Sequence, residues 1–305
     1  MRTAPTLAWT GRLTLPVRLM VDASNLIAWA NGAAADTRAM KAHVRSGYEA
    51  AVSDHVARYD ELGEAHYRRI TDALLQRVDL RGRRVLDVGC GTGILMLRTL
   101  ERGATSVVGV ALAAHMLWEC RRKAAIAGPA RHVGLCQGDA EALPFESGSF
   151  DVVLCSMVLG LVPDQARLVE EMARLVRPGG VLALATHGPE HYWEAIDAAF
   201  RAAPKRDVLG YRIELWPRDE KEIGKLLRRA GLSHPNTQRL GWQDTFASAL
   251  DLYDFFAATS ASWWLAAVLG DRVEHVDQSM RRGFARRRLT RLTMDVVLAY
   301  ALKPA

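Results

Sequence analysis

The stretch VLDVGCGTG, residues 85–93, places three glycines at alternate positions directly after an apolar run that contains an aspartate. An apolar run that ends in a glycine turn and continues into a helical segment predicts a strand, a tight turn and a helix whose N-terminus faces a ligand. Because glycine lacks a Cβ, the backbone of such a turn approaches a bound molecule closely. The sequence therefore predicts a small-molecule site at this turn.

The spacing of the glycines separates this turn from two common nucleotide-binding turns. The dinucleotide fingerprint G-x-G-x-x-G would place its third glycine at position 94, where this chain has isoleucine. A phosphate-binding P-loop ends in Gly-Lys-Ser or Gly-Lys-Thr, which the turn lacks. The spacing thus argues against NAD and FAD, and ATP hydrolysis has little support.

Short apolar runs alternate with helix-sized segments from residue 83 onward. Such runs are typical of parallel strands buried on both faces, and the alternation predicts an α/β fold with a doubly wound, Rossmann-like sheet that binds ligands at the carboxyl ends of its strands. A helix is expected over 219–232, and two late strands are expected to form an antiparallel tail of the sheet. The seven predicted strands cover residues 83–89, 106–112, 132–139, 150–158, 180–187, 237–246 and 292–304.

Helices are expected in the rest of the chain. Residues 1–80 are predicted to form an N-terminal helical extension, and residues 81–305 the main domain, with a helical insertion at about 247–290. Its aromatic stretch, 251–264, is interpreted either as core packing or as a lid over an apolar acceptor. Its arginine-rich stretch, 281–288, is interpreted as a solvated helix face or as a site for phosphate or an anionic lipid surface.

Composition limits the function classes. Half of the 305 residues are hydrophobic and the net charge is +6, which suffices for a full core and requires no anionic partner. The four cysteines form no CxxC pair, which predicts reduced thiols, no metal and a cytoplasmic location. Polar residues interrupt the apolar segment 15–30, so no integral membrane span is predicted, while a peripheral membrane contact stays open. A small-molecule substrate, no nucleic acid, and a monomer or homodimer are expected.

Four segments, taken in order, resemble the class I S-adenosylmethionine-dependent methyltransferases, in particular their small-molecule, type 11-like branch. The turn at 85–93 resembles the first motif of the family. Residues 138–164 resemble its third strand, the aspartate that reads adenine, an LPF turn and its fourth strand, and residues 170–184 resemble the helix and turn before the fifth strand. The resemblance covers about residues 80–302 and implies S-adenosylmethionine as the cofactor.

The resemblance also assigns cofactor contacts. Asp87 would hydrogen-bond the methionine ammonium group, and the three glycines would let the backbone pass close to the methionine and ribose. Asp139 would accept a hydrogen bond from the adenine amino group, with the Ala140 N–H on a ring nitrogen. The predicted cofactor-binding residues are Tyr59, Asp87, Gly89, Gly91, Gly93, Leu112, Met116, Asp139, Ala140 and Ser156.

Two departures from the family pattern keep a second class of function open. The family usually has an acidic residue for the ribose hydroxyls at the end of its second strand, where this chain has Ala111. Many small-molecule relatives also keep a histidine just after the fourth strand, which the stretch SMVLGLVPD lacks. The alternative is therefore a cofactor-binding relative that does not methylate, such as a cyclase-like or decarboxylase-like protein or a regulatory subunit.

Any general base must therefore come from elsewhere in the chain. A phenol needs about 4 kcal/mol to ionise at pH 7, so a base assists O-methylation. The stretch THGPEHYWEAID, residues 186–197, follows the fifth predicted strand, and a second group, which includes Tyr48, His55 and His66, lies near the N-terminus. The predicted catalytic residues are His187, Glu190, His191 and Tyr192.

The predicted function is S-adenosylmethionine-dependent O- or C-methylation of a small hydrophobic acceptor in specialised or cofactor metabolism.

Overall fold

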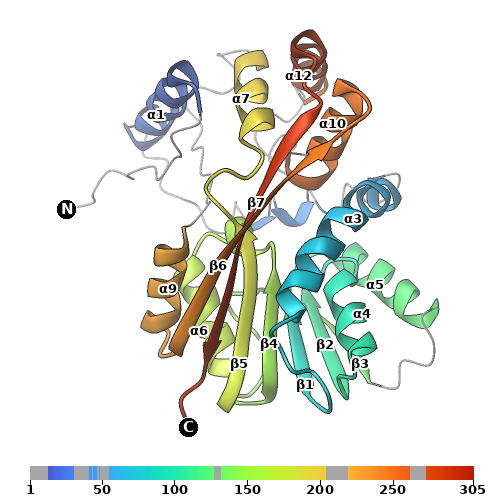
Figure 1. Cartoon of the computed structure of the whole chain (residues 1–305), viewed down its shortest axis with the longest axis vertical. Coiled ribbons are helices and arrows are strands. Elements are labelled where there is room, and N and C mark those ends of the chain that lie inside the picture. Colours follow the sequence, from blue (N-terminus) through green and yellow to red (C-terminus); the bar gives the residue numbers. More distant parts are fainter. Residues whose placement is uncertain are drawn as a thin grey trace.

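A seven-stranded sheet with the order β3-β2-β1-β4-β5-β7-β6 runs through the centre of the molecule (Figure 1). The computed structural model describes residues 13–30, 41–42, 44–46, 48, 55–126, 132–203, 219–261 and 273–305. The strands are β1 (Arg84–Val88), β2 (Ser106–Ala111), β3 (Val133–Gln137), β4 (Phe150–Ser156), β5 (Val176–His187), β6 (Ser233–Thr245) and β7 (Arg291–Leu302). The first five strands are parallel, and β7 pairs antiparallel with both β5 and β6, which confirms the predicted sheet.

Helices cover both faces of the sheet because the parallel strands are apolar on both sides. On one face α3 (His55–Leu75), α4 (Ile94–Glu101) and α5 (Ala114–Ile126) share a buried cluster with Val85 and Val107 of the strands. On the other face, α6 (Gln165–Leu175) and α9 (Glu220–Arg229) pack on Leu86 and Val153. The helix expected over 219–232 begins with a capping box, in which Glu222 N donates to Asp219 Oδ1 at 2.8 Å.

A helical cap lies beyond the end of the sheet at which β5 leads into α7 (Figure 1). It consists of α1 (Leu15–Ala30), α7 (Trp193–Ala202), α10 (Ala249–Phe256), the π-helical turn η2 (Ala257–Ala261) and α12 (Val273–Arg287). Leu252, Tyr253, Phe255 and Phe256 are buried in the core of this cap, together with Phe284 of α12. The core interpretation of the aromatic stretch therefore holds for residues 252–256, whereas residues 262–264 lie outside the described part of the chain.

The strand order of the sheet reverses at β1, because the chain adds β2 and β3 on one side of β1 and then β4 and β5 on the other. A crevice opens at such a switch point because the connections after the two neighbouring strands leave in opposite directions. The glycine turn follows β1 directly, so the fold places it at the edge of this crevice.

Candidate functional site

The glycine turn after β1 leaves one position open to a ligand. Gly89, Gly91 and Gly93 have φ values of 76°, 52° and 93°, a region that L side chains rarely adopt. A Cβ at Gly89 would lie 2.2 Å from Val158, and one at Gly93 would lie 2.6 Å from Cys120 Sγ. A Cβ at Gly91 would meet no protein atom within 4 Å. The first and third glycines are thus required by packing, whereas the second exposes backbone to the crevice.

Asp87, at the end of β1, is a buried carboxylate without a side-chain partner among the described residues. The residue is 1% exposed, and neither Oδ atom accepts a hydrogen bond from another described side chain. Burial raises the pKa of Asp87 to about 7 because the charged form has lost its water, and the backbone N–H of Met96 offsets only part of this effect. An orphaned carboxylate in a crevice fits a cationic ligand group, and the ammonium group of S-adenosylmethionine is of this kind.

Asp139, just after β3, is held by a lysine from the N-terminal region. Lys41 Nζ lies 2.6 Å from Asp139 Oδ2 and also forms an ion pair with Glu141. Burial lowers the pKa of Lys41, but its bonds to Asp139 and Glu141 outweigh this and raise the pKa overall. Asp139 Oδ1 accepts the Glu141 N–H at 2.9 Å, so the carboxylate is fixed in orientation. The adenine-reading position predicted from the sequence therefore carries a second, unforeseen contact.

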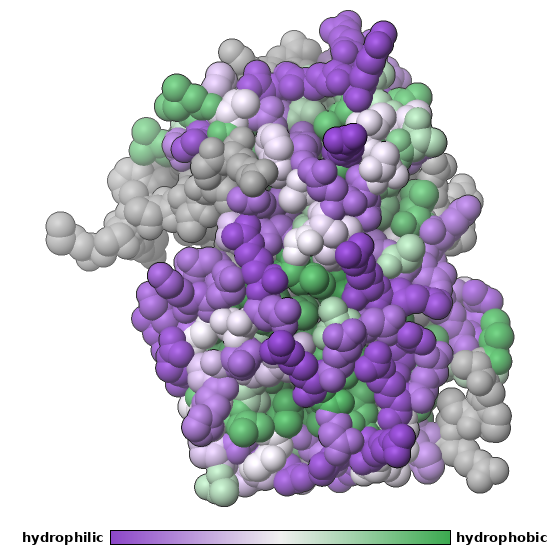
Figure 2. Space-filling view, viewed as in Figure 1, coloured by the Kyte–Doolittle hydropathy of each residue, from purple (hydrophilic) through white to green (hydrophobic). Residues whose placement is uncertain are grey.

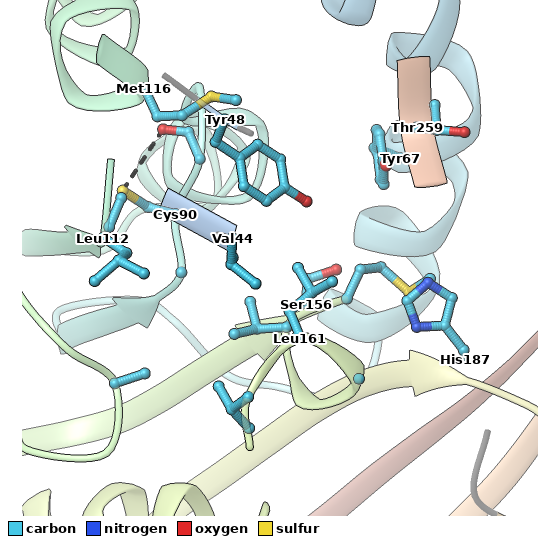
Figure 3. A pocket seen from close by; sticks show the side chains of 18 of the residues that line it. Val44, Tyr48, Tyr67, Cys90, Leu112, Met116, Ser156, Leu161, His187 and Thr259 are labelled. Carbon is cyan, nitrogen blue, oxygen red and sulfur yellow. Dashed lines mark hydrogen bonds between the residues drawn. The ribbon is translucent and has the colours of Figure 1, made fainter. Parts of the chain in front are cut away.

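Lys41 belongs to a helical face that covers the cofactor crevice. Val44 and Tyr48 follow it at helical spacing and line the same cavity, whereas Arg45 and Ser46 face away and are exposed. Figure 3 shows Val44 and Tyr48 directed into the cavity. Tyr48 packs against the buried cluster of Cys90, Ala111, Ala113 and Met116. The position at which the family has a ribose-binding acid is thus an apolar surface covered by a tyrosine.

One cavity of about 260 Å³ joins this crevice to the cap. The cofactor candidates that line it are Asp87, Gly89, Gly91, Leu112, Met116, Asp139, Ala140 and Ser156. Gly93 packs behind the turn, and the side chain of Tyr59 lies outside the described part of the structure. At the far end, His187, His191, Tyr192 and Thr259 line the cavity (Figure 3 shows His187 and Thr259). The sequence predicted both ends of the cavity, but not its continuity.

Three imidazoles lie close together at the cap end of this cavity: His187, which is half-buried, and the buried His191 and His66. The ring of His191 lies 4.7 Å from the ring of His187 and 5.8 Å from that of His66 in α3. Burial lowers the pKa of His187 to about 4 and that of His66 to about 3, and it lowers the pKa of His191 well below the ordinary value. All three rings are therefore neutral at pH 7, each with one ring nitrogen that can accept a hydrogen bond, and each is a weaker base than an exposed histidine.

The two residues after Glu190 are fixed in the wall of the cavity. His191 Nδ1 lies 2.7 Å from the carbonyl oxygen of Asp295, and its Nε2 is buried without a described partner. The Tyr192 hydroxyl lies 3.3 Å from Thr259 Oγ1 and 3.4 Å from His66 Nε2. Burial raises the pKa of Tyr192 well above its ordinary value, so this residue stays protonated and acts as a hydrogen-bond donor.

The structure does not bring Glu190 to the other catalytic candidates. Its carboxylate lies 3.7 Å from Arg239 of β6, and it is absent from the described cavity lining. Its backbone N–H donates to Asp295 Oδ2 at 2.6 Å, because the loop after β5 is bound to the buried Asp295, which also pairs with the exposed Arg239. The structure thus directs Glu190 to Arg239 and away from the described cavity lining, although its neighbours in the sequence line the cavity.

Asp60 of α3 ties the glycine turn to two helices, a role that the sequence did not reveal. Its Oδ1 accepts the Thr92 hydroxyl at 2.7 Å, and its Oδ2 lies 2.6 Å from Lys123 of α5. His115 is exposed on α5 and is not among the described residues that line the cavity. The only sequence signal for Asp60 is its place directly after Tyr59.

The described ranges offer neither a metal site nor a membrane-spanning helix. They contain no group of three or more His, Cys, Asp or Glu side chains arranged to hold a metal ion. None of the helices in those ranges combines the length and apolarity needed to cross a membrane. Cys90, Cys120, Cys136 and Cys155 are all free thiols.

Sequence comparison gives the family of the chain. A family model described as a methyltransferase domain matches residues 85–180. Ubiquinone biosynthesis O-methyltransferase from Neisseria meningitidis serogroup C is 36% identical over 165 residues, which cover 52% of this chain and 68% of that protein. The chain belongs to the class I S-adenosylmethionine-dependent methyltransferases. This methyltransferase is also 36% identical, over 150 residues, to malonyl-[acyl-carrier protein] O-methyltransferase from Enterobacter lignolyticus, covering 47% of this chain and 55% of that protein.

Solved structures share the fold of this methyltransferase at lower sequence identity. The YcgJ protein from Bacillus subtilis is 18% identical, with a TM-score of 0.55 over 79% of this chain and 99% of that chain. The [4+2]-cyclase SpnF is 22% identical, with a TM-score of 0.51 over 78% of this chain and 82% of that chain. At these identities the likeness concerns the fold alone. The methyltransferase prediction is confirmed, and the non-methylating alternative gains no support.

Proposed function

We propose that this methyltransferase binds S-adenosylmethionine between the glycine turn and the helical face of Lys41, Val44 and Tyr48, and methylates a hydroxyl group of an uncharged, apolar acceptor at the cap end of the cavity. The observation that carries the proposal is the single cavity that joins the unpaired carboxylate of Asp87 to the neutral imidazole of His187. Such a cavity holds a cationic donor and a protic acceptor within one desolvated space.

The cofactor end is matched to the chemistry of S-adenosylmethionine. Asp87 would bind the ammonium group, and the open backbone at Gly91 would lie against the methionine and ribose. Asp139 would accept from adenine, while Met116 and Leu112 supply apolar surface for the base. When bound, the cofactor supplies an electrophilic methyl group on a sulfonium sulfur. The ribose would be covered by Tyr48, since Ala111 offers no carboxylate.

The acceptor end favours an uncharged hydroxyl over a carboxylate. Lys41 is the only Lys or Arg among the described residues that line the cavity, and it is already paired with Asp139 and Glu141. A malonyl carboxylate would therefore be desolvated there without a cation, which is unfavourable. Apolar side chains, which include Leu13 and Ile196, would instead suit a phenol or catechol with a hydrocarbon substituent. The name of the Neisseria relative, an O-methyltransferase of ubiquinone biosynthesis, agrees with this acceptor class.

His187 is the proposed general base. It ends β5 next to Ser156 of β4, since Ser156 pairs with Ala185 two residues before it, and its ring faces the cavity (Figure 3). The acceptor hydroxyl would give its proton to the neutral imidazole while its oxygen forms the new bond to carbon and the carbon–sulfur bond breaks. The products are a methyl ether, S-adenosylhomocysteine and a proton. Alignment of the two reactants contributes most of the rate, and the base adds roughly 10²- to 10⁴-fold.

Label transfer tests this function. The purified protein is incubated with methyl-labelled S-adenosylmethionine and a panel of alkyl-substituted catechols, with a malonyl thioester as the charged competitor. We expect labelled catechol ethers, and we expect His187→Ala to lower kcat by roughly 10²- to 10⁴-fold with the affinity for S-adenosylhomocysteine unchanged. His115→Ala, which removes an exposed imidazole outside the cavity, is the matched control.

Each outcome bears on a different part of the proposal. Absence of S-adenosylhomocysteine binding in calorimetry would overturn the cofactor site. Label in the malonyl thioester but in none of the catechols would overturn the uncharged acceptor. Full kcat in His187→Ala would show that the proton leaves by another route.

A further inference from the structure

Two segments of the cap carry features that catalysis does not use. One is α1, and the other is the arginine-rich end of α12, residues 281–288. Figure 1 places both helices at the same end of the molecule, on either side of α7. Figure 2 shows hydrophobic residues in the region of α1 and strongly hydrophilic residues over the region of α12.

α1 is apolar on two opposite faces, but only one of them packs on the protein. Val17 and Val21, together with Leu13 just before the helix, are buried against Phe200 of α7. The other face carries four exposed aliphatic side chains at helical spacing, with the exposed Asp22 between Leu19 and Leu26. Leu15, Leu19, Leu26 and Ile27 are 65%, 59%, 62% and 41% exposed. Packing within the cap therefore accounts for the apolar side chains of Val17 and Val21. It does not account for the outer aliphatic stripe formed by the four exposed side chains.

Asp197 of α7 connects the start of α1 to the end of α12. Its Oδ1 accepts the Thr14 hydroxyl at 2.6 Å, immediately before α1 begins. Its Oδ2 lies 2.7 Å from Arg201 Nε and 3.9 Å from Arg287 Nη1 of α12. The aliphatic stripe thus begins close to the basic helix end, where Arg282, Arg286 and Arg288 are exposed.

We propose that the outer face of α1 and the basic end of α12 form one surface that docks on an anionic lipid bilayer. Aliphatic side chains of an interfacial helix enter the boundary between headgroups and acyl chains, and neighbouring arginines bind the lipid phosphates. Charge complementarity favours lipid over a second copy of the chain. A twofold contact through α1 would gather the arginines of both copies at one interface, where they repel each other.

The docking surface adjoins the acceptor end of the cavity. Leu13, two residues before the start of α1, and Ile196 of α7 both line the cavity. A docked enzyme would hold this end of the cavity against the membrane and could receive a lipid-soluble acceptor from it. This consequence rests on the proposed apolar acceptor, whereas docking itself is independent of the reaction and is tested without it.

Vesicle sedimentation tests the docking surface. The full-length protein is mixed with vesicles of phosphatidylcholine alone or of phosphatidylcholine with phosphatidylglycerol. We expect stronger binding to the anionic vesicles, which added salt weakens. The L15Q/L19Q/L26Q variant should lower binding to anionic vesicles about tenfold. The R282Q/R286Q/R288Q variant, which leaves the contact of Arg287 with Asp197 intact, should lose the preference for anionic lipid.

The control variant W118Q/I126Q removes apolar side chains that are 64% and 72% exposed on α5, away from the cap. It should bind vesicles like the parent protein. Failure of the parent protein to sediment with anionic vesicles would overturn the proposal, as would retained binding in the α1 variant. A dimer that the α1 variant converts into a monomer would show that a second copy covers this face. S-adenosylhomocysteine affinity shows whether the α1 variant is folded. If that variant misfolds, the arginine variant, which does not alter α1, still tests the proposal, and an unchanged preference for anionic vesicles in it would overturn the proposal.

Discussion

At the scale of single residues, Asp87 is the group whose energetics depend most on a ligand. A buried carboxylate without a partner destabilises the folded protein once it ionises, because the unfolded chain hydrates it. A pKa near 7, compared with an ordinary value of 3.8, corresponds to roughly 4 kcal/mol at pH 8. A bound ammonium group would remove this penalty, so the same residue makes the empty protein less stable and the complex tighter.

Asp87→Asn should therefore have opposite effects on stability and on binding. The free energy of unfolding at pH 8 should rise by up to roughly 4 kcal/mol, because no charge remains to be buried. The Kd for S-adenosylhomocysteine should rise about 10- to 100-fold, because a hydrogen bond to a charged group is lost. Denaturant unfolding and calorimetry measure the two quantities. In the parent protein the affinity should also fall as the pH drops below 7, since protonated Asp87 cannot pair with an ammonium group.

Asp151→Asn provides the comparison for this residue. Asp151 is paired with Arg177 Nε at 2.5 Å at the start of β4, remote from the glycine turn. The substitution should reduce stability and leave S-adenosylhomocysteine affinity unchanged. Reduced stability in Asp87→Asn, with unchanged affinity, would mean that Asp87 serves only the fold.

At the scale of elements, the helical face formed by Lys41, Val44 and Tyr48 covers the cofactor crevice through one ion-paired lysine. Lys41→Ala should release this face and raise the Kd for S-adenosylhomocysteine about tenfold, in line with the loss of one charge-assisted contact. Arg45→Ala removes the same charge from the outward face of the same segment and should leave the Kd unchanged. Tighter binding in Lys41→Ala would instead show that the lysine competes with the cofactor for Asp139.

The sequence allowed prediction of those features whose pattern lies within a few consecutive residues. These features are the strands, the helices and the residues at the two ends of the cavity. Asp87 lies near the end of a strand, and Gly91 and Asp139 lie just after strands, that their own apolar neighbours define. Local motifs were therefore sufficient to place them at this edge of the sheet, while their roles were assigned by resemblance to the family. The Lys41–Asp139 contact spans 98 residues and the approach of His66 to Tyr192 spans 126, and no local pattern encodes such pairs. Glu190 shows the converse error, because a turn of the backbone directs it to Arg239 although its neighbours face the cavity.

At the scale of the whole molecule, burial of a cavity between sheet and cap makes the fold sensitive to acid. His66, His187 and His191 have pKa values below the ordinary 6.5 in the folded protein, so the unfolded chain binds their protons first as the pH falls. Asp87 acts in the opposite direction, because its raised pKa keeps a proton on the folded protein between about pH 4 and pH 7. Three histidines against one aspartate leave a net excess of protons on the unfolded state near pH 5.

As the pH falls through about 5, the free energy of unfolding should therefore decrease by roughly 3 kcal/mol per pH unit, because unfolding takes up about two net protons. Denaturant unfolding at a series of pH values between 4.5 and 8 measures this slope, with about pH 7 as the upper bound of the steep region. Asp87→Asn should make the slope steeper, because the opposing proton is removed, whereas His187→Gln should make it shallower by the contribution of one proton. A free energy of unfolding that stays level between pH 4.5 and pH 6 would mean that water reaches these imidazoles and that the cavity is not the desolvated space on which the proposed chemistry depends.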